Sequence, residues 1–205
     1  MLIYRKTPRL FGVLVNYIYF CSVKVNEMEK KELRKIIRQR KAELSCEERK
    51  RLSHEVCRKV METEVWQEAR TVFLYMAMDD EVDTRELIAD GMRKGKTVVL
   101  PTCVGNDLVL RVYEGEESMV SGAYGIMEPT GRVMEEKDYG EIDLAVVPGV
   151  AFDKDGGRMG RGRGFYDRTL RKIPRCYKMG VCWEVQMVEK VPMDEFDIKM
   201  NNVII

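Results

Sequence analysis

Short apolar segments of strand type alternate with helical segments along most of this chain. The apolar segments are residues 71–76, 97–100, 108–113, 144–147 and 177–182, and helical patterns cover residues 28–44, 45–61, 83–93 and 165–172. Near-continuous apolar strands are typical of a parallel sheet that is buried on both faces. We therefore predict an α/β fold: a single domain with a mostly parallel central sheet, helices on both faces, and a helical pair at its N-terminal end.

Individual residues predict where several of these elements begin and end. Ser45 and Glu48 have the spacing of a capping box, which indicates that the second helix starts there. Asp83 and Glu86 suggest a cap for the third helix, and Pro101 is expected to end the strand at 97–100. Residues 114–140 mix glycine, proline and charge, and we expect a surface loop.

The length of 205 residues suits one domain, which we assign to residues 28–205. Residues 1–27 contain basic residues followed by an apolar run at 10–23, as in a signal peptide. That run is shorter than the ~20 apolar residues of a spanning helix. We expect residues 1–27 to be an N-terminal extension outside the core fold.

Composition excludes several classes of function. Lys and Arg number 35 against 34 Asp and Glu, so the net charge of +1 creates no global attraction to nucleic acid or membrane. The single histidine, His54, excludes a multi-histidine metal centre. Six cysteines without a CxxC pair favour reduced thiols over three disulfides. We expect a cytoplasmic protein that is a monomer.

The segment at residues 156–164, which we call the Gly/Arg loop, carries the strongest functional signal. It holds five glycines interleaved with Arg158, Arg161 and Arg163, and a predicted helix follows from Phe165. Glycine costs backbone entropy but lets main-chain N–H groups approach a ligand closely. Those donors, the guanidinium groups and a helix N-terminus together suit phosphate oxygens. Phosphate binding is therefore the favoured interpretation.

Other interpretations of the Gly/Arg loop remain open. No Gly-Lys-Ser/Thr follows it, so it is not a Walker A loop, and its glycine spacing is not that of a Rossmann fingerprint. Residues 157–160 match the GXXG of a KH domain, and the Arg-Gly alternation occurs in RNA-binding tracts. RNA contact and a flexible turn with solvated arginines are the two alternatives.

Acidic residues near the loop suggest a metal. Asp167 lies two residues into the predicted helix, and a carboxylate beside phosphates is favourable when Mg²⁺ lies between them. Asp197 is a second acidic candidate, although the sequence does not bring it to the loop. Ligands of open α/β sheets bind at the carboxyl ends of strands, so we expect the site at the loops after Met76 and Val147.

Four segments together resemble the 5-formyltetrahydrofolate cyclo-ligase family. They are residues 148–167, 76–84, 30–34 and 191–197, in the family's order, and the resemblance covers roughly residues 28–205. It implies an ATP- and Mg²⁺-dependent conversion of 5-formyltetrahydrofolate to 5,10-methenyltetrahydrofolate, with release of ADP and phosphate. The reaction would pass through a phosphorylated formyl intermediate, for which the enzyme mainly aligns two ligands.

The resemblance also implies roles for individual residues. ATP contacts would be Lys30, Arg34, Arg158, Gly160, Arg161, Gly162, Arg163, Gly164, Phe165 and Tyr166. Folate contacts would be Met76, Glu81 and Tyr166, the Mg²⁺ ligands Asp167 and Asp197, and the catalytic groups Arg161, Arg163 and Tyr166. Met76 has core packing as an equal alternative.

Three positions depart from the common family pattern. The family commonly has lysine where this chain has Arg163, tyrosine where it has Phe165 and histidine where it has Phe196. Two other functions are weighed against the cyclo-ligase. One is a non-catalytic nucleotide- or RNA-binding module, and the other is a relative whose folate site has drifted to a different acid or amide.

Overall fold

The computed structural model describes residues 29–122 and 125–205. The predicted extension at 1–27 lies outside the described residues. A six-stranded sheet forms the centre, in the order β10-β9-β6-β1-β2-β3, and only the β2–β3 pair is antiparallel. Its strands are β1 (Thr71–Phe73), β2 (Thr97–Val104), β3 (Asp107–Val112), β6 (Leu144–Val147), β9 (Tyr177–Val181) and β10 (Asn202–Ile204). The predicted mostly parallel sheet is confirmed.

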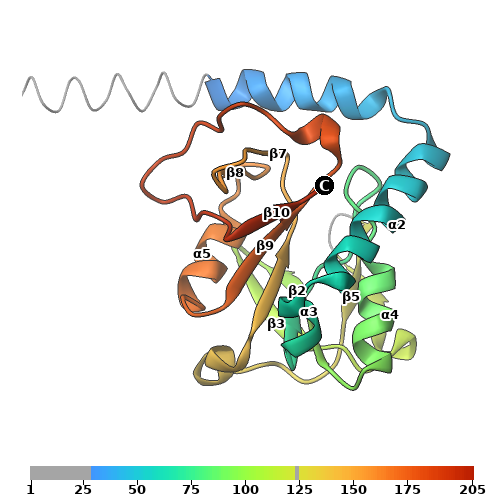
Figure 1. Cartoon of the computed structure of the whole chain (residues 1–205). Coiled ribbons are helices and arrows are strands. Elements are labelled where there is room, and N and C mark those ends of the chain that lie inside the picture. Colours follow the sequence, from blue (N-terminus) through green and yellow to red (C-terminus); the bar gives the residue numbers. More distant parts are fainter. Residues whose placement is uncertain (1–28, 123–124) are drawn as a thin grey trace, which may run out of the picture.

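Helices cover both faces of the sheet, as predicted (Figure 1). They are α2 (Cys46–Glu62), α3 (Glu64–Glu68), α4 (Arg85–Arg93) and α5 (Phe165–Lys172). Neighbouring strand residues alternate between two cores: Val72 packs with side chains of α2, α3 and α4, whereas Phe73 packs with Leu170 of α5. Burial on both faces explains why these strands lack polar alternation.

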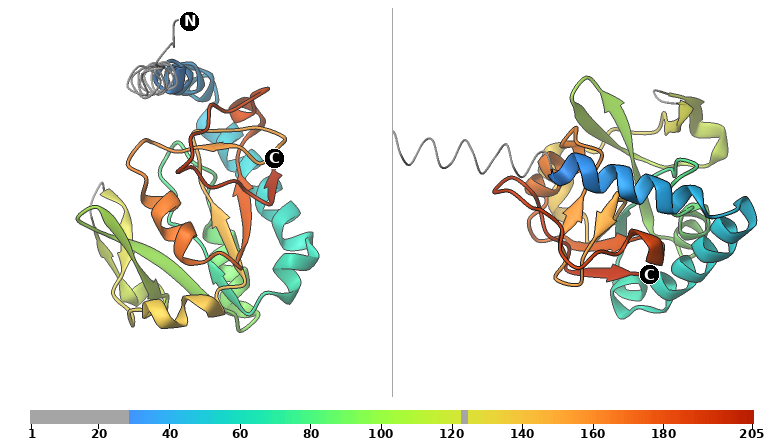
Figure 2. Two further views of the ribbon diagram at one scale, coloured as in Figure 1. Left: turned by 90° about the vertical axis from the view of Figure 1, so that its left-hand side faces the viewer. Right: turned by 90° about the horizontal axis from the view of Figure 1, so that it is seen from above.

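The first helix runs from residue 29, where the described part of the chain begins, to residue 42. Its Ile37 is fully buried against Val150, Met159 and Val191. Two of these residues flank or lie in a small hairpin of β7 (Ala151–Phe152) and β8 (Arg158–Met159). Seen from above, the helix lies across one end of the sheet (Figure 2). With α2, whose capping box at Ser45 and Glu48 is present, it forms the predicted helical pair.

Three predictions about element boundaries were wrong. Pro101 does not end β2, because the ladder with β1 stops at Val99 and Pro101 lies where β2 pairs only with β3. A proline is tolerated where one edge of a strand is open. Thr84, not Asp83, is the N-cap residue of α4, and no side chain caps that helix. The apolar run at 71–76 leaves the sheet after Phe73.

The expected loop at 114–140 is also partly structured. It contains the antiparallel strands β4 (Met119–Ser121) and β5 (Met127–Pro129) and the 3-10 helix η1 (Glu116–Ser118), and the 3-10 helix η3 (Glu136–Glu141) begins within it. Outside this segment, a further 3-10 helix, η4 (Glu184–Gln186), follows β9. Strands of three residues are too short to give a periodic signal.

The five cysteines in the described ranges, Cys46, Cys57, Cys103, Cys176 and Cys182, are free thiols. Among the residues that the structure describes, no helix combines the length and apolar character needed to span a bilayer.

Candidate active site

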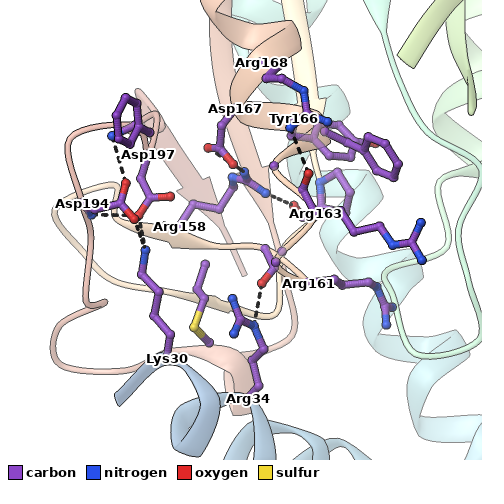
Figure 3. A pocket seen from close by; sticks show the side chains of 18 of the residues that line it. Lys30, Arg34, Arg158, Arg161, Arg163, Tyr166, Asp167, Arg168, Asp194 and Asp197 are labelled. Carbon is purple, nitrogen blue, oxygen red and sulfur yellow. Dashed lines mark hydrogen bonds and ion pairs between the residues drawn. The ribbon is translucent and has the colours of Figure 1, made fainter. Parts of the chain in front are cut away.

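A cleft of about 800 Å³ opens where β1 and β6 end. Glu81 from the segment after β1 and Pro148 from the segment after β6 both line it, as expected for a sheet of this topology. The cleft also takes side chains from the first helix, the Gly/Arg loop, the start of α5 and the 191–201 segment (Figure 3). Its volume lies in the range of small-molecule sites, roughly 300–1,000 Å³.

All but one of the predicted site residues line this cleft. They are Lys30, Arg34, Glu81, Arg158, Gly160, Arg161, Gly162, Arg163, Gly164, Phe165, Tyr166, Asp167 and Asp197. The exception is Met76, which is half-buried and packs against the core beneath α2 and α4. Core packing, which was the alternative interpretation of Met76, therefore describes its observed position.

Three glycines of the Gly/Arg loop, Gly156, Gly162 and Gly164, have positive φ angles that favour glycine. Gly162 and Gly164 have φ angles of +101° and +67°, in the region that side chains rarely adopt. Arg34 crosses from the first helix and donates from Nε to the carbonyl of Gly160 at 3.0 Å. Gly164 is also the N-cap of α5, and no side chain caps this helix. The first N–H groups of α5 are therefore suited to an anion in the cleft.

Arg158 lies in the wall of the cleft, with 3% of its surface exposed. Its Nη2 donates to both carboxylate oxygens of Asp167, at 2.9 and 3.0 Å, and Nη1 donates to the carbonyl of Pro148. Asp167 Oδ1 also accepts the backbone N–H of Ile198 at 3.2 Å. The structure thus pairs a predicted phosphate contact with a predicted metal ligand.

Tyr166 connects this ion pair to the core. Its ring stacks on Phe73, with the centroids 6.0 Å apart, and the Arg158 guanidinium lies 5.6 Å from the ring centre. Burial and the nearby charge of Glu81 raise the pKa of the Tyr166 hydroxyl, against a smaller opposing effect of Arg158. The phenol is therefore neutral at physiological pH and is able to donate a hydrogen bond.

Lys30 connects the first helix to the 191–201 segment. Its ammonium donates to Asp194 Oδ2 at 2.9 Å and to Asp197 Oδ2 at 2.5 Å, across 164 and 167 residues. Burial alone would lower the pKa of Lys30, but the two carboxylates outweigh it and raise that pKa. Asp197 therefore lies at the same cleft as Asp167, although sequence reasoning placed only Asp167 beside the loop.

Two carboxylates at the site were missed by the sequence analysis. Asp194 shares Lys30 with Asp197, and Asp80 shares Arg161 with Glu81. Both lie inside segments that carried the family resemblance, although no role was assigned to them. An acidic residue of this kind has no spacing signal of its own, and the fold alone brings it to a cation.

The cleft fits a polyphosphate together with a divalent cation. Lys30, Arg34 and Arg161 place cationic groups around it, and α5 contributes a helix N-terminus. In the described residues no group of three or more His, Cys, Asp or Glu side chains is arranged to hold a metal. Mg²⁺ typically uses one or two carboxylates and takes its remaining ligands from phosphate and water, so Asp167 and Asp197 suit this arrangement.

Comparisons with known proteins show which family the chain resembles. A family model described as "5-formyltetrahydrofolate cyclo-ligase family" matches residues 26–205. The chain is 33% identical to the mouse (Mus musculus) 5-formyltetrahydrofolate cyclo-ligase over 195 residues, covering 89% of this chain and 96% of the mouse protein. It is 35% identical to the Escherichia coli K12 enzyme of the same name over 176 residues, covering 82% and 96% of the two chains.

A solved structure shows the same fold. The Aquifex aeolicus 5,10-methenyltetrahydrofolate synthetase superposes with a TM-score of 0.75 at 35% identity, covering 85% of this chain and 88% of that one. The match of the family model extends over all of the described residues. The protein is therefore an enzyme of the ligase class, and it belongs to the 5-formyltetrahydrofolate cyclo-ligase family.

Proposed function

We propose that this protein converts 5-formyltetrahydrofolate to 5,10-methenyltetrahydrofolate and consumes MgATP, releasing ADP and phosphate. The names of its relatives support the folate reaction. The observation that carries the ATP dependence is a single cleft in which the Gly/Arg loop and the start of α5 meet cations of the first helix and two carboxylates.

The nucleotide would lie along the Gly/Arg loop. Its phosphates would take backbone N–H groups of residues 160–164 and the N-terminus of α5, with Lys30 and Arg34 approaching from the first helix. The left-handed conformations at Gly162 and Gly164 support this placement, because no side chain there obstructs a close approach. Arg161 and Arg163 would neutralise charge that develops during phosphoryl transfer.

Asp167 and Asp197 would hold Mg²⁺ at the phosphates. The metal would supply charge neutralisation at the transferred group. Asp167 is already oriented by Arg158 and by the Ile198 N–H, so its carboxylate needs little reorganisation. Asp197 receives Lys30 and the Asp194 N–H at the same oxygen, Oδ2.

The folate would occupy the side of the cleft that carries Glu81. Its carboxylate suits the donor edge of a pterin, and the neutral Tyr166 hydroxyl would donate to the formyl group or to a phosphate. The formyl oxygen attacks the γ-phosphorus and ADP leaves. N10 then attacks the formyl carbon, loses its proton, and the oxygen departs with phosphate. Met76 would contribute by packing behind this segment.

The test is the near-ultraviolet absorbance of the methenyl product. Purified protein should form it from 5-formyltetrahydrofolate only when ATP and Mg²⁺ are both present, and omission of either should abolish it. Chelation of the metal followed by its restoration serves as the reversible control. Folded protein that forms no product under complete conditions would reject the proposal.

The alternative of an RNA-binding module is not favoured, since the family match covers the whole described domain. It would require salt-sensitive RNA affinity that Arg161→Ala and Arg163→Ala weaken. A drifted substrate would instead show itself as ATP hydrolysis stimulated by another acid or amide.

A further inference from the structure

Arg161 spans the cleft from the Gly/Arg loop to the segment after β1. Its Nη2 donates to Asp80 Oδ1 at 2.5 Å and to Glu81 Oε1 at 3.0 Å, and its Nε lies 3.3 Å from the same Glu81 oxygen. Glu81 Oε2 in turn accepts the backbone N–H of Met78. The Arg161 guanidinium therefore joins two neighbouring carboxylates. The segment that carries them is itself held by a hydrogen bond between its own residues.

Asp80 is shared between Arg161 and Lys41, the penultimate residue of the first helix. Lys41 Nζ donates to Asp80 Oδ2 at 2.6 Å and to the Asp80 carbonyl at 2.7 Å. The Lys41 side chain is only 5% exposed, so its ammonium is largely removed from water. A charge in that position needs a fixed partner, and Asp80 provides both of its contacts.

Arg49 of α2 connects the same two segments through hydrogen bonds to their backbone carbonyls. Its Nη2 donates to the Lys41 carbonyl at 2.8 Å, and its Nη1 donates to the Asp79 carbonyl at 3.4 Å. The main chain that carries Lys41 and the main chain that precedes Asp80 thus share a support. Because Arg49 holds both segments, we expect the Asp80 carboxylate to have a defined position before any ligand arrives.

We propose that Lys41 and Asp80 are positioning residues that hold Arg161 in place across the cleft. Neither is among the cleft-lining residues, so both act through Arg161. The proposal rests on the function proposed above, which places Arg161 at the nucleotide. Arg161 is 45% exposed, and a long side chain with that exposure samples many rotamers in water. Ordering it beforehand reduces the entropy lost when a nucleotide binds.

A purely electrostatic role of Asp80 and a positioning role predict opposite effects of Asp80→Asn. The negative charge of Asp80 near a phosphate site opposes nucleotide binding, so its removal would lower the KM for ATP if charge alone mattered. If Asp80 positions Arg161, Asp80→Asn raises that KM, about five- to tenfold, as is usual for residues that act through a contact network. Asp79→Asn removes the same charge from the neighbouring exposed residue and should leave the KM unchanged.

The first experiment needs no ligand. Hydrogen–deuterium exchange of the peptide covering the Gly/Arg loop should quicken at least about threefold in Asp80→Asn and in Lys41→Met, because the loop loses its anchor. Asp79→Asn and Lys35→Met, a change at an exposed lysine of the same helix, should match the wild type. Unchanged exchange in both test variants would overturn the proposal.

The second experiment asks whether Asp80 acts through Arg161. In the background of Arg161→Ala, Asp80→Asn should change the KM for ATP by less than about twofold. A full five- to tenfold effect in that background, or a lowered KM in Asp80→Asn alone, would overturn the positioning role. Absence of product formation by the wild-type protein would instead reject the proposed function. The hydrogen–deuterium exchange result would still decide whether Lys41 and Asp80 hold the loop.

Discussion

The Arg158 guanidinium holds the Asp167 carboxylate through a single nitrogen that lies 2.9 and 3.0 Å from its two oxygens. Arg158 is almost fully buried, and the Asp167 side chain is 16% exposed. A buried cation thus fixes the carboxylate that we assign to Mg²⁺, and it does so from within the cleft wall. This arrangement separates the role of Arg158 from that of the exposed arginines of the same loop.

Removal of Arg158 should cost stability. Arg158→Met leaves Asp167 without its partner in a poorly solvated site, and we expect the free energy of unfolding to fall by about 3 kcal/mol. Urea denaturation followed by circular dichroism measures it. The double variant Arg158→Met with Asp167→Asn should recover part of the loss. A double variant that loses the sum of the two single effects would show that the pair is not coupled.

Asp167→Asn should affect turnover more than folding, because its amide oxygen can still accept from the buried Arg158. The amide keeps the shape of the side chain but is a poor Mg²⁺ ligand, so we expect kcat to fall about 100-fold or more and the Mg²⁺ requirement to rise. Asp155→Asn, at an exposed acid of the β7–β8 turn, is the matched control. Normal turnover of Asp167→Asn at low Mg²⁺ would show that the metal assignment is wrong.

Acid should weaken the contact between α3 and α4. Burial alone would raise the pKa of Asp90, but hydrogen bonds from Trp66, Arg93 and Lys94 outweigh it and hold the pKa below 3.8. Asp90 therefore contributes stability that is fully present above pH 3.8 and is lost as the pH falls through the lower, folded-state pKa.

The measurement is the difference in unfolding free energy between the wild type and Asp90→Asn. We expect about 1 kcal/mol at pH 7, since two of the three partners are partly solvated, and a decrease toward zero below pH 3.8. A difference that stays constant between pH 7 and pH 3 would contradict the ionised state of Asp90.

Arg163→Lys should be tolerated. It restores the residue that the family pattern commonly has at this position, and it retains the positive charge while losing the planar fork. We expect the KM for ATP to change by less than about threefold, because a lysine can serve as a point donor to phosphate. A large loss of activity would show that the fork geometry of Arg163 is used here.

The sequence predicted most of the sheet because its strands are buried on both faces. The segment 144–147 and the helix at 165–172 have the predicted bounds, since each contains a strong periodic or apolar signal. The prediction at Pro101 was wrong because the tolerance of a strand for proline depends on which edge is paired, and sequence does not reveal that. The short strands β4 and β5 gave no pattern.

The site was predictable where local chemistry is dense and was not where it depends on the fold. Glycines and arginines concentrated in nine residues identified the loop, and all of them that were assigned roles line the cleft. The placement of Asp197 needed a contact across 167 residues, and Asp80 and Asp194 have no spacing signal that predicts their cationic partners. The burial of Arg158 was also invisible, since a Gly/Arg pattern is the same for solvated and buried arginines.

The most direct test is a crystal structure of the protein with a non-hydrolysable ATP analogue and Mg²⁺. We expect the terminal phosphate to accept backbone N–H groups of residues 160–164 and the metal to lie between that phosphate and Asp167. The same phosphate should face the side of the cleft that carries Glu81. A nucleotide bound elsewhere, with the Gly/Arg loop making no contact to its phosphates, would contradict the account.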